Sequence, residues 1–187
     1  MKNTEQVISD LQAGNRRYAL GAGIHPNQTL HRRDEMLAGQ NPSAVIIGCS
    51  DSRVPPEIIF DCGLGELFVI RTAGHVADES VIASVQYAVE HLHTDLILVL
   101  GHSDCGAVKS AVQGLEASGA LGALLARIKP PLKAAAARAG DLLESAVIEN
   151  IRLTLAQLKE TAWPRELMIR GACYSLKSGL VTFDPEP

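Results

Sequence analysis

The chain has 187 residues, of which 47% are hydrophobic and 20% are charged. This length and composition are those of a globular domain with a substantial core. The net charge of −4 excludes the strongly basic surface of a nucleic-acid-binding protein. No apolar run approaches the ~20 residues of a membrane-spanning helix, and the N-terminus lacks a signal-peptide core. We therefore expect a cytoplasmic protein whose four cysteines stay reduced.

Helices are predicted from apolar residues that recur at helical spacing. Val7, Leu11 and Tyr18 predict an N-terminal helix over 4–19 that ends before Gly21. The next helices along the chain are a short one at 29–38 and an amphipathic one at 81–92, with Asp78 available as its cap. Further helices are predicted at 105–115, at 142–160 and in the Ala/Leu-rich segment 119–138, which Pro130 and Pro131 interrupt.

Strands are predicted where apolar residues run without interruption. Three such runs, at 44–48, 66–71 and 95–100, are typical of buried parallel strands. Residues 166–176 and 180–183 resemble a strand pair at a sheet edge. Because strands alternate with helices, we expect an α/β fold with a mainly parallel central sheet of four strands plus an edge strand or hairpin, flanked by helices. The absence of repeats and linkers predicts a single domain over 1–187.

Metal-binding side chains follow two of the predicted strands. Cys49 comes where the first strand ends, and His102 and Cys105 come where the third ends. Sites in open α/β sheets form beyond the carboxyl ends of the strands. If these two strands are neighbours, the three side chains meet. Two thiolates and one imidazole suit zinc, and three protein ligands leave the fourth position open for water, which is typical of catalytic zinc.

Asp51 and Arg53 lie beside the first cysteine and suggest a working ion pair. In an extended segment their side chains point to the same side, and a guanidinium can clamp a carboxylate bidentately. The clamped Asp51 could orient an attacking hydroxide. If Arg53 released it, Asp51 could instead swing onto the metal and close the fourth position, so the pair is either an orienting device or a latch.

Ordinary structural roles compete with these interpretations. A lone cysteine is most often a core thiol, and we assign Cys62 and Cys173 this role. An isolated Asp–Arg pair is most often a surface ion pair. Four histidines are expected at the surface or at helix ends, namely His25, His31, His91 and His93.

Two segments resemble the signature motifs of β-class carbonic anhydrases, in the bacterial, plant-like branch. They are Cys49-Ser50-Asp51-Ser52-Arg53-Val54 with Pro56-Glu57, and Gly101-His102-Ser103-Asp104-Cys105-Gly106-Ala107. The resemblance runs from about Asn15 to Gly114 and resumes weakly in 171–183.

The resemblance implies reversible hydration of carbon dioxide to bicarbonate and a proton. Zinc-bound hydroxide would attack the substrate, oriented by an Asp51–Arg53 dyad. One Zn²⁺ per subunit would be held by Cys49, His102 and Cys105, with Asp51 as a further ligand in a closed state only.

The resemblance also implies substrate-binding residues and a partner subunit. Gln40 and Gly106 would contact substrate, and Phe68 and Tyr87 would line the pocket across a dimer interface. Without the family, the two aromatic residues are equally well explained as core residues. A homodimer or dimer of dimers is expected, with residues 1–38 as a helical arm on the partner and no nucleic-acid or membrane partner.

The chain departs from the family at two places. Residues 71–75 read Arg-Thr-Ala-Gly-His in place of an asparagine-containing motif, which predicts a different pocket polarity. Ile46 replaces the tryptophan of the bicarbonate-inhibited branch, which predicts an open site with Asp51 held by Arg53. Two alternative functions stay open: hydrolysis of carbon disulfide or carbonyl sulfide on the same fold, and a non-catalytic zinc-binding or redox-sensing module.

Overall fold

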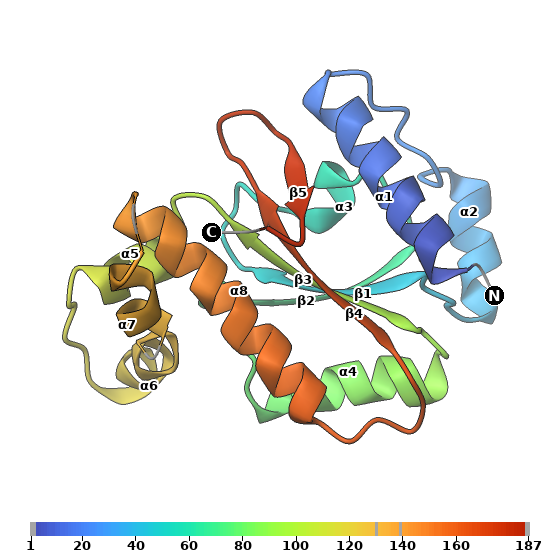
Figure 1. The fold of residues 1–187 in the computed structure, drawn as a ribbon. Helices are drawn as coiled ribbons and strands as arrows, with labels where there is room; N and C mark the ends of the chain where they lie inside the picture. Colours follow the sequence, from blue (N-terminus) through green and yellow to red (C-terminus); the bar gives the residue numbers. More distant parts are fainter. Residues whose placement is uncertain (1–2, 130, 139, 186–187) are drawn as a thin grey trace.

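The centre of the molecule is a five-stranded sheet, seen in a computed structural model that describes residues 3–129, 131–138 and 140–185. The strand order is β2-β1-β3-β4-β5 (Figure 1). Four strands run parallel, and β5 pairs antiparallel with β4. The predicted fold class is confirmed. The strands are β1 (Ala44–Cys49), β2 (Leu67–Thr72), β3 (Leu96–His102), β4 (Met168–Tyr174) and β5 (Val181–Phe183).

Helices connect the strands and cover the sheet on both sides. α8 packs against β3 and β4, and α4 packs against β1 and β2, whereas α1 and α3 lie together on the other side (Figure 1). The α-helices are α1 (Thr4–Ala19), α2 (Leu30–Glu35), α3 (Pro56–Ile59), α4 (Glu79–His91), α5 (Gly106–Val112), α6 (Gly119–Ile128), α7 (Pro131–Ala136) and α8 (Leu142–Glu160). The 3₁₀ turns are η1 (Met36–Ala38) and η2 (Ala73–His75).

Burial along the strands follows from this layering. Every residue of β1 and β3 is buried, because both strands lie inside the sheet and are covered on two faces. β2 is at one edge, and its side chains are only partly buried. The continuous apolar runs in the sequence therefore reflect two-sided burial in the central strands.

Most predicted elements are confirmed, and α3 and η2 are additions. Asp78 caps α4 as predicted, because its carboxylate accepts a hydrogen bond from the Val81 N–H at 3.0 Å. α3 is a single turn that begins at Pro56, too short for apolar periodicity to reveal it. The proline interruption separates α6 from α7; Pro130 itself lies outside the described residues.

A buried carboxylate in the turn after α3 holds α1 and the loop that follows α1. Asp61 accepts hydrogen bonds from Arg17 Nε at 2.6 Å and from the N–H groups of Ile24 and His25 at 3.1 and 2.9 Å. Farther along this segment, Leu37 is 84% exposed, so the predicted packing of the arm on a partner stays a prediction. Among the described helices, none is both long and apolar enough to cross a membrane.

Replacing Asp61 with Ala should lower the free energy of unfolding by about 2 to 3 kcal/mol, because a partly buried guanidinium and two N–H groups lose their buried acceptor. Burial raises the pKa of Asp61, but hydrogen bonds from Arg17, Ile24 and His25 outweigh burial and bring the pKa below its ordinary 3.8. The stabilisation is therefore complete above about pH 4 and is lost as the pH falls further.

Urea unfolding of both proteins at several pH values tests this expectation. The control is Glu35→Ala, which removes an exposed ion pair with Arg32 and should change the free energy of unfolding by less than ~0.5 kcal/mol. Equal losses in the two variants at neutral pH would contradict the anchoring role of Asp61.

Candidate active site

Three metal-binding side chains meet at the carboxyl edge of the sheet, where β1 and β3 end. β1 pairs in parallel with β3, with Gly48 opposite Leu100. Cys49 and His102 are the last residues of these two strands, and Cys105 caps α5 directly after β3. Their ligand atoms lie within 4.8 Å of one another, and all three residues are buried. The structure thus brings together the cluster that the sequence predicted.

The spacing of these atoms fits a tetrahedral zinc ion. The two sulfur atoms are 3.9 Å apart, close to the ~3.8 Å that two Zn–S bonds of about 2.3 Å subtend at a tetrahedral angle. The His102 Nδ1 atom lies 2.9 Å from the Ser103 carbonyl oxygen and donates to it, which leaves the lone pair on Nε2. Among the described residues, Nε2 of His102 is the one buried side-chain nitrogen or oxygen without a hydrogen-bond partner.

The two thiols share one proton unequally. A hydrogen bond from the Cys105 thiol, helped by the nearby His102 imidazole and by the N–H groups of Asp51 and Gly74, holds the pKa of Cys49 well below its ordinary 9.0. The same contact, together with burial, raises the pKa of Cys105. The proton is therefore held preferentially by Cys105, and metal binding would release it.

Asp51 and Arg53 form a bidentate pair beside this cluster. Arg53 Nε donates to Asp51 Oδ1 at 2.9 Å, and the second guanidinium nitrogen donates to Oδ2 at 2.7 Å. The expected reason for the pairing was wrong: the segment is not extended. It is a turn in which the Val54 N–H donates to the Asp51 carbonyl and the Arg53 N–H donates to the Asp51 carboxylate.

The clamped carboxylate faces the metal ligands and stays ionised. The hydrogen bond from Arg53 holds the pKa of Asp51 well below its usual range. The Oδ2 atom of Asp51 is 4.0 Å from His102 Nε2. Arg71 on β2 fixes the main chain here, because its guanidinium donates to the carbonyl oxygens of Cys49 and Asp51 at 2.8 and 2.6 Å. The sequence reasoning did not identify this role of Arg71.

Gly106 begins α5 directly after the last ligand. The first N–H groups of a helix have no partner within the helix. A Cβ atom added to Gly106 would meet nothing within 4 Å, so its main chain borders open space beside Cys105. An N–H group in this position can donate a hydrogen bond to a substrate oxygen on which negative charge develops.

The chain does not bring its other expected substrate residues to this cluster. Gln40 lies before the start of β1, whereas Cys49 is the last residue of β1, and β1 alone spans about 16 Å. Phe68 pairs with Val45 at the start of β1, also far from Cys49. Tyr87 is 50% exposed on α4, with its ring 6.3 Å from that of Phe68. Tyr87 is therefore not a core aromatic in this chain.

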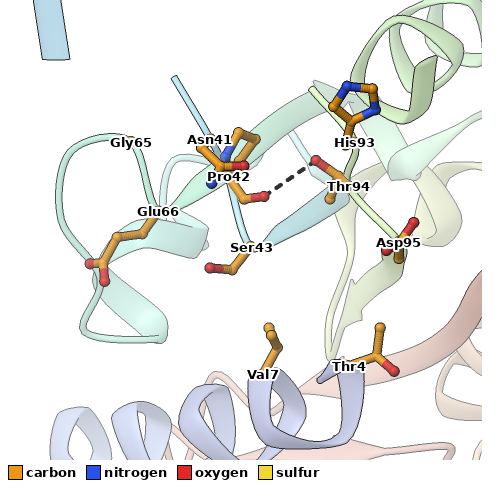
Figure 2. A pocket seen from close by; sticks show the side chains of 10 residues that line it. All are labelled: Thr4, Val7, Asn41, Pro42, Ser43, Gly65, Glu66, His93, Thr94 and Asp95. Carbon is orange, nitrogen blue, oxygen red and sulfur yellow. Dashed lines mark hydrogen bonds between the residues drawn. The ribbon is translucent and has the colours of Figure 1, made fainter. Parts of the chain in front are cut away.

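A cavity of about 270 Å³ lies at the end of the sheet where the parallel strands begin, between α1 and the starts of β1 and β3. Figure 2 shows Thr4 and Val7 of α1 facing Pro42 and Ser43 across it. The dashed contact is the hydroxyl of Thr94, which donates to the Pro42 carbonyl at 3.3 Å. The cavity contains none of the cluster residues.

The remaining candidates have structural surroundings. Cys62 and Cys173 pack against the core, and burial raises their pKa values to about 12 and about 11. His75 is 1% exposed, so it has no direct path to solvent, and burial lowers its pKa to about 4. The four other histidines outside the cluster are exposed, as predicted: His25, His31, His91 and His93.

Comparison with known proteins identifies the family. The sequence model of the family described as Carbonic anhydrase matches residues 44–181. Carbonic anhydrase 2 of Mycobacterium tuberculosis is 39% identical over 192 residues, covering 96% of this chain and 93% of the relative. A carbonic anhydrase of Mycolicibacterium smegmatis is 39% identical over 194 residues, covering 97% and 94%.

Solved structures agree with the sequence comparison. A β-carbonic anhydrase of Aspergillus fumigatus superposes with a TM-score of 0.67 at 26% identity, covering 97% of this chain and 93% of the other. One of two tetrameric β-carbonic anhydrases from Sordaria macrospora shares the fold with a TM-score of 0.76 at 24% identity, covering 96% of both chains. With a Cys–His–Cys cluster where two parallel strands end, this chain belongs to the β-class carbonic anhydrases, enzymes that interconvert carbon dioxide and bicarbonate.

Proposed function

We propose that this chain hydrates carbon dioxide with one Zn²⁺ per subunit, held by Cys49, His102 and Cys105. The observation that carries the proposal is the buried, unpartnered Nε2 of His102, which shares a 4.8 Å cluster with two free thiols. A cluster with only a structural role would not leave a buried nitrogen without a hydrogen-bond partner. A structural zinc site would need a fourth protein ligand. When bound, zinc lowers the pKa of water to about 7 and so provides a hydroxide nucleophile at neutral pH.

Asp51 and Arg53 orient that nucleophile. Arg53 keeps the Asp51 carboxylate ionised and fixed in direction, so the carboxylate can accept a hydrogen bond from the attacking group. The geometry favours the orienting role over the latch, because both carboxylate oxygens are bonded to Arg53. The N–H of Gly106 would stabilise the negative charge that develops on a substrate oxygen.

A partner subunit completes the pocket. Gln40, Phe68 and Tyr87 are too far from Cys49 of their own chain to touch its substrate, so we assign them to the site of the neighbouring chain. The half-exposed Tyr87 and several exposed leucines of the arm, residues 1–38, would be covered in such a dimer. Because buried thiols must stay reduced to bind zinc, the cytoplasm is the expected compartment.

Cys105→Ala should remove zinc and reduce carbon dioxide hydration to the uncatalysed rate, because two ligands cannot hold the ion in place. Metal analysis and stopped-flow hydration measure both effects. Cys173→Ala is the matched control, because it removes a partly buried thiol of β4 outside the cluster. A metal-replete, active Cys105→Ala enzyme would refute the ligand assignment.

Arg53→Ala should keep zinc bound and lower kcat by about 10- to 100-fold, because Asp51 loses both guanidinium hydrogen bonds and keeps only the one from the main chain. The zinc content and kcat are measured on the same preparation. Arg152→Ala, which removes an exposed ion pair on α8, should leave both unchanged. Wild-type turnover in Arg53→Ala would reject the orienting role.

Mixing two inactive variants tests whether the site is shared. In a dimer of one Cys105→Ala chain and one Gln40→Ala chain, one site would have intact zinc ligands from one chain and an intact Gln40 from the other. Random exchange at equal amounts should restore about a quarter of the wild-type activity if Gln40 acts across the interface. If Gln40 served its own chain, no mixed site would be intact and activity would not rise above that of the separate variants.

A further inference from the structure

A main-chain N–H group from outside the two signature motifs donates to a metal ligand. The N–H of Gly74 lies 3.3 Å from the Cys49 sulfur atom, in the interior. Gly74 belongs to the turn η2 that follows β2, and its backbone is left-handed, with φ +64° and ψ 23°. A Cβ atom here would lie 2.9 Å from Ile128 and 3.3 Å from Ala107. The turn therefore needs glycine to bring this N–H group to the sulfur.

A buried amide on α8 holds the same turn from the other side. Asn150, 2% exposed, donates from Nδ2 to the Gly74 carbonyl oxygen at 2.8 Å. Its Nδ2 atom also lies 3.3 Å from His75 Nε2. An amide nitrogen has two protons, so one can serve the carbonyl and the other the imidazole.

The imidazole is fixed in turn by the same helix. Thr154 follows Asn150 by four residues on α8, and its hydroxyl lies 3.5 Å from His75 Nδ1. Residues four apart share one helix face. A Cβ atom on Gly101, the residue before His102, would approach His75 Nε2 to 3.2 Å, so the ring also packs against the end of β3.

The burial of three polar side chains around one turn calls for a functional explanation. Asn150, His75 and Thr154 are among the few polar side chains that are fully buried in the described part of the chain. Such groups cost free energy when buried without hydrogen bonds, and replacing a whole hydrogen-bonded set by apolar residues of the same shape can be neutral or stabilising. All three converge on η2, which supplies an N–H group to a metal ligand from outside the segments that carry the ligands.

We propose that Asn150, supported by His75 and Thr154, is a positioning residue of the metal site, which fixes the Gly74 main chain so that its N–H stays directed at the Cys49 sulfur. The inference rests on the proposed zinc site. Hydrogen bonds from outside the ligand set orient metal ligands and tune their electron donation, and their loss commonly weakens metal affinity by about 10- to 100-fold.

The test replaces Asn150 with Leu, which has similar size and no donor. Zinc affinity is measured by competition with a chelator, and the cobalt(II)-substituted protein reports on the sulfur through its thiolate-to-metal charge-transfer band. We expect affinity to fall about tenfold or more and the band to shift, because the sulfur loses a fixed hydrogen bond. Wild-type affinity with an unshifted band would overturn the proposal.

Asn15→Leu is the matched control. Asn15 is also an asparagine that is 2% exposed, and its Nδ2 donates to the main-chain carbonyls of Ile59 and Gly179 at 3.2 and 2.9 Å. The Asn15→Leu variant should have lower thermal stability, with the cobalt band and the zinc affinity unchanged. A similar shift in both variants would mean that general destabilisation, and not positioning, explains the result, and would overturn the proposal.

If Asn150→Leu fails to fold, the near-isosteric Thr154→Val decides. It should shift the same band by a smaller amount and weaken zinc binding measurably, and an unchanged band in the folded variant would overturn the proposal. The zinc site itself is tested separately by Cys105→Ala. If that variant retains zinc, the proposed function fails; if it loses zinc while Asn150→Leu matches the wild type, only the positioning role fails.

Discussion

The parallel pairing of β1 with β3 is the constraint on which the site depends. Cys49 and His102 are 53 positions apart in the chain, and they meet because two buried strands run side by side in the same direction and end together. A slip of one residue in this register would turn every side chain of the shifted strand to the other face of the sheet. The full burial of both strands therefore also protects the position of the ligands.

Around this pairing, the site combines a local part with a remote part. Asp51 and Arg53 are held by a turn of four residues and need little help from the rest of the fold. The sulfur of Cys49, in contrast, receives hydrogen bonds from its own turn and from η2, and Arg71 of β2 binds the carbonyl oxygen of the same cysteine. The edge strand thus contributes main-chain support to a cluster whose ligands come from its neighbours.

The sequence was informative where a physical pattern is local. Uninterrupted apolar runs indicated β1 and β3, and the cysteines and histidine at their ends indicated the metal cluster. The turn at 51–54 was misjudged, because a two-residue spacing fits an extended segment and an Asp-initiated turn equally well. The pairing of Asn150 with His75 gave no signal, because an asparagine inside an amphipathic helix is normally expected to face solvent. Their contact joins positions 75 residues apart, which only tertiary packing determines.

Gln40 and Cys49 lie at opposite ends of β1, and this placement has a kinetic consequence. If a neighbouring chain provides the glutamine, an isolated chain carries two halves of different active centres and no whole one. Specific activity would then follow the fraction of associated chains, and would decline on dilution once the protein concentration approached the dissociation constant of the dimer. Assembly would thereby set the amount of competent enzyme through mass action, without any effector molecule.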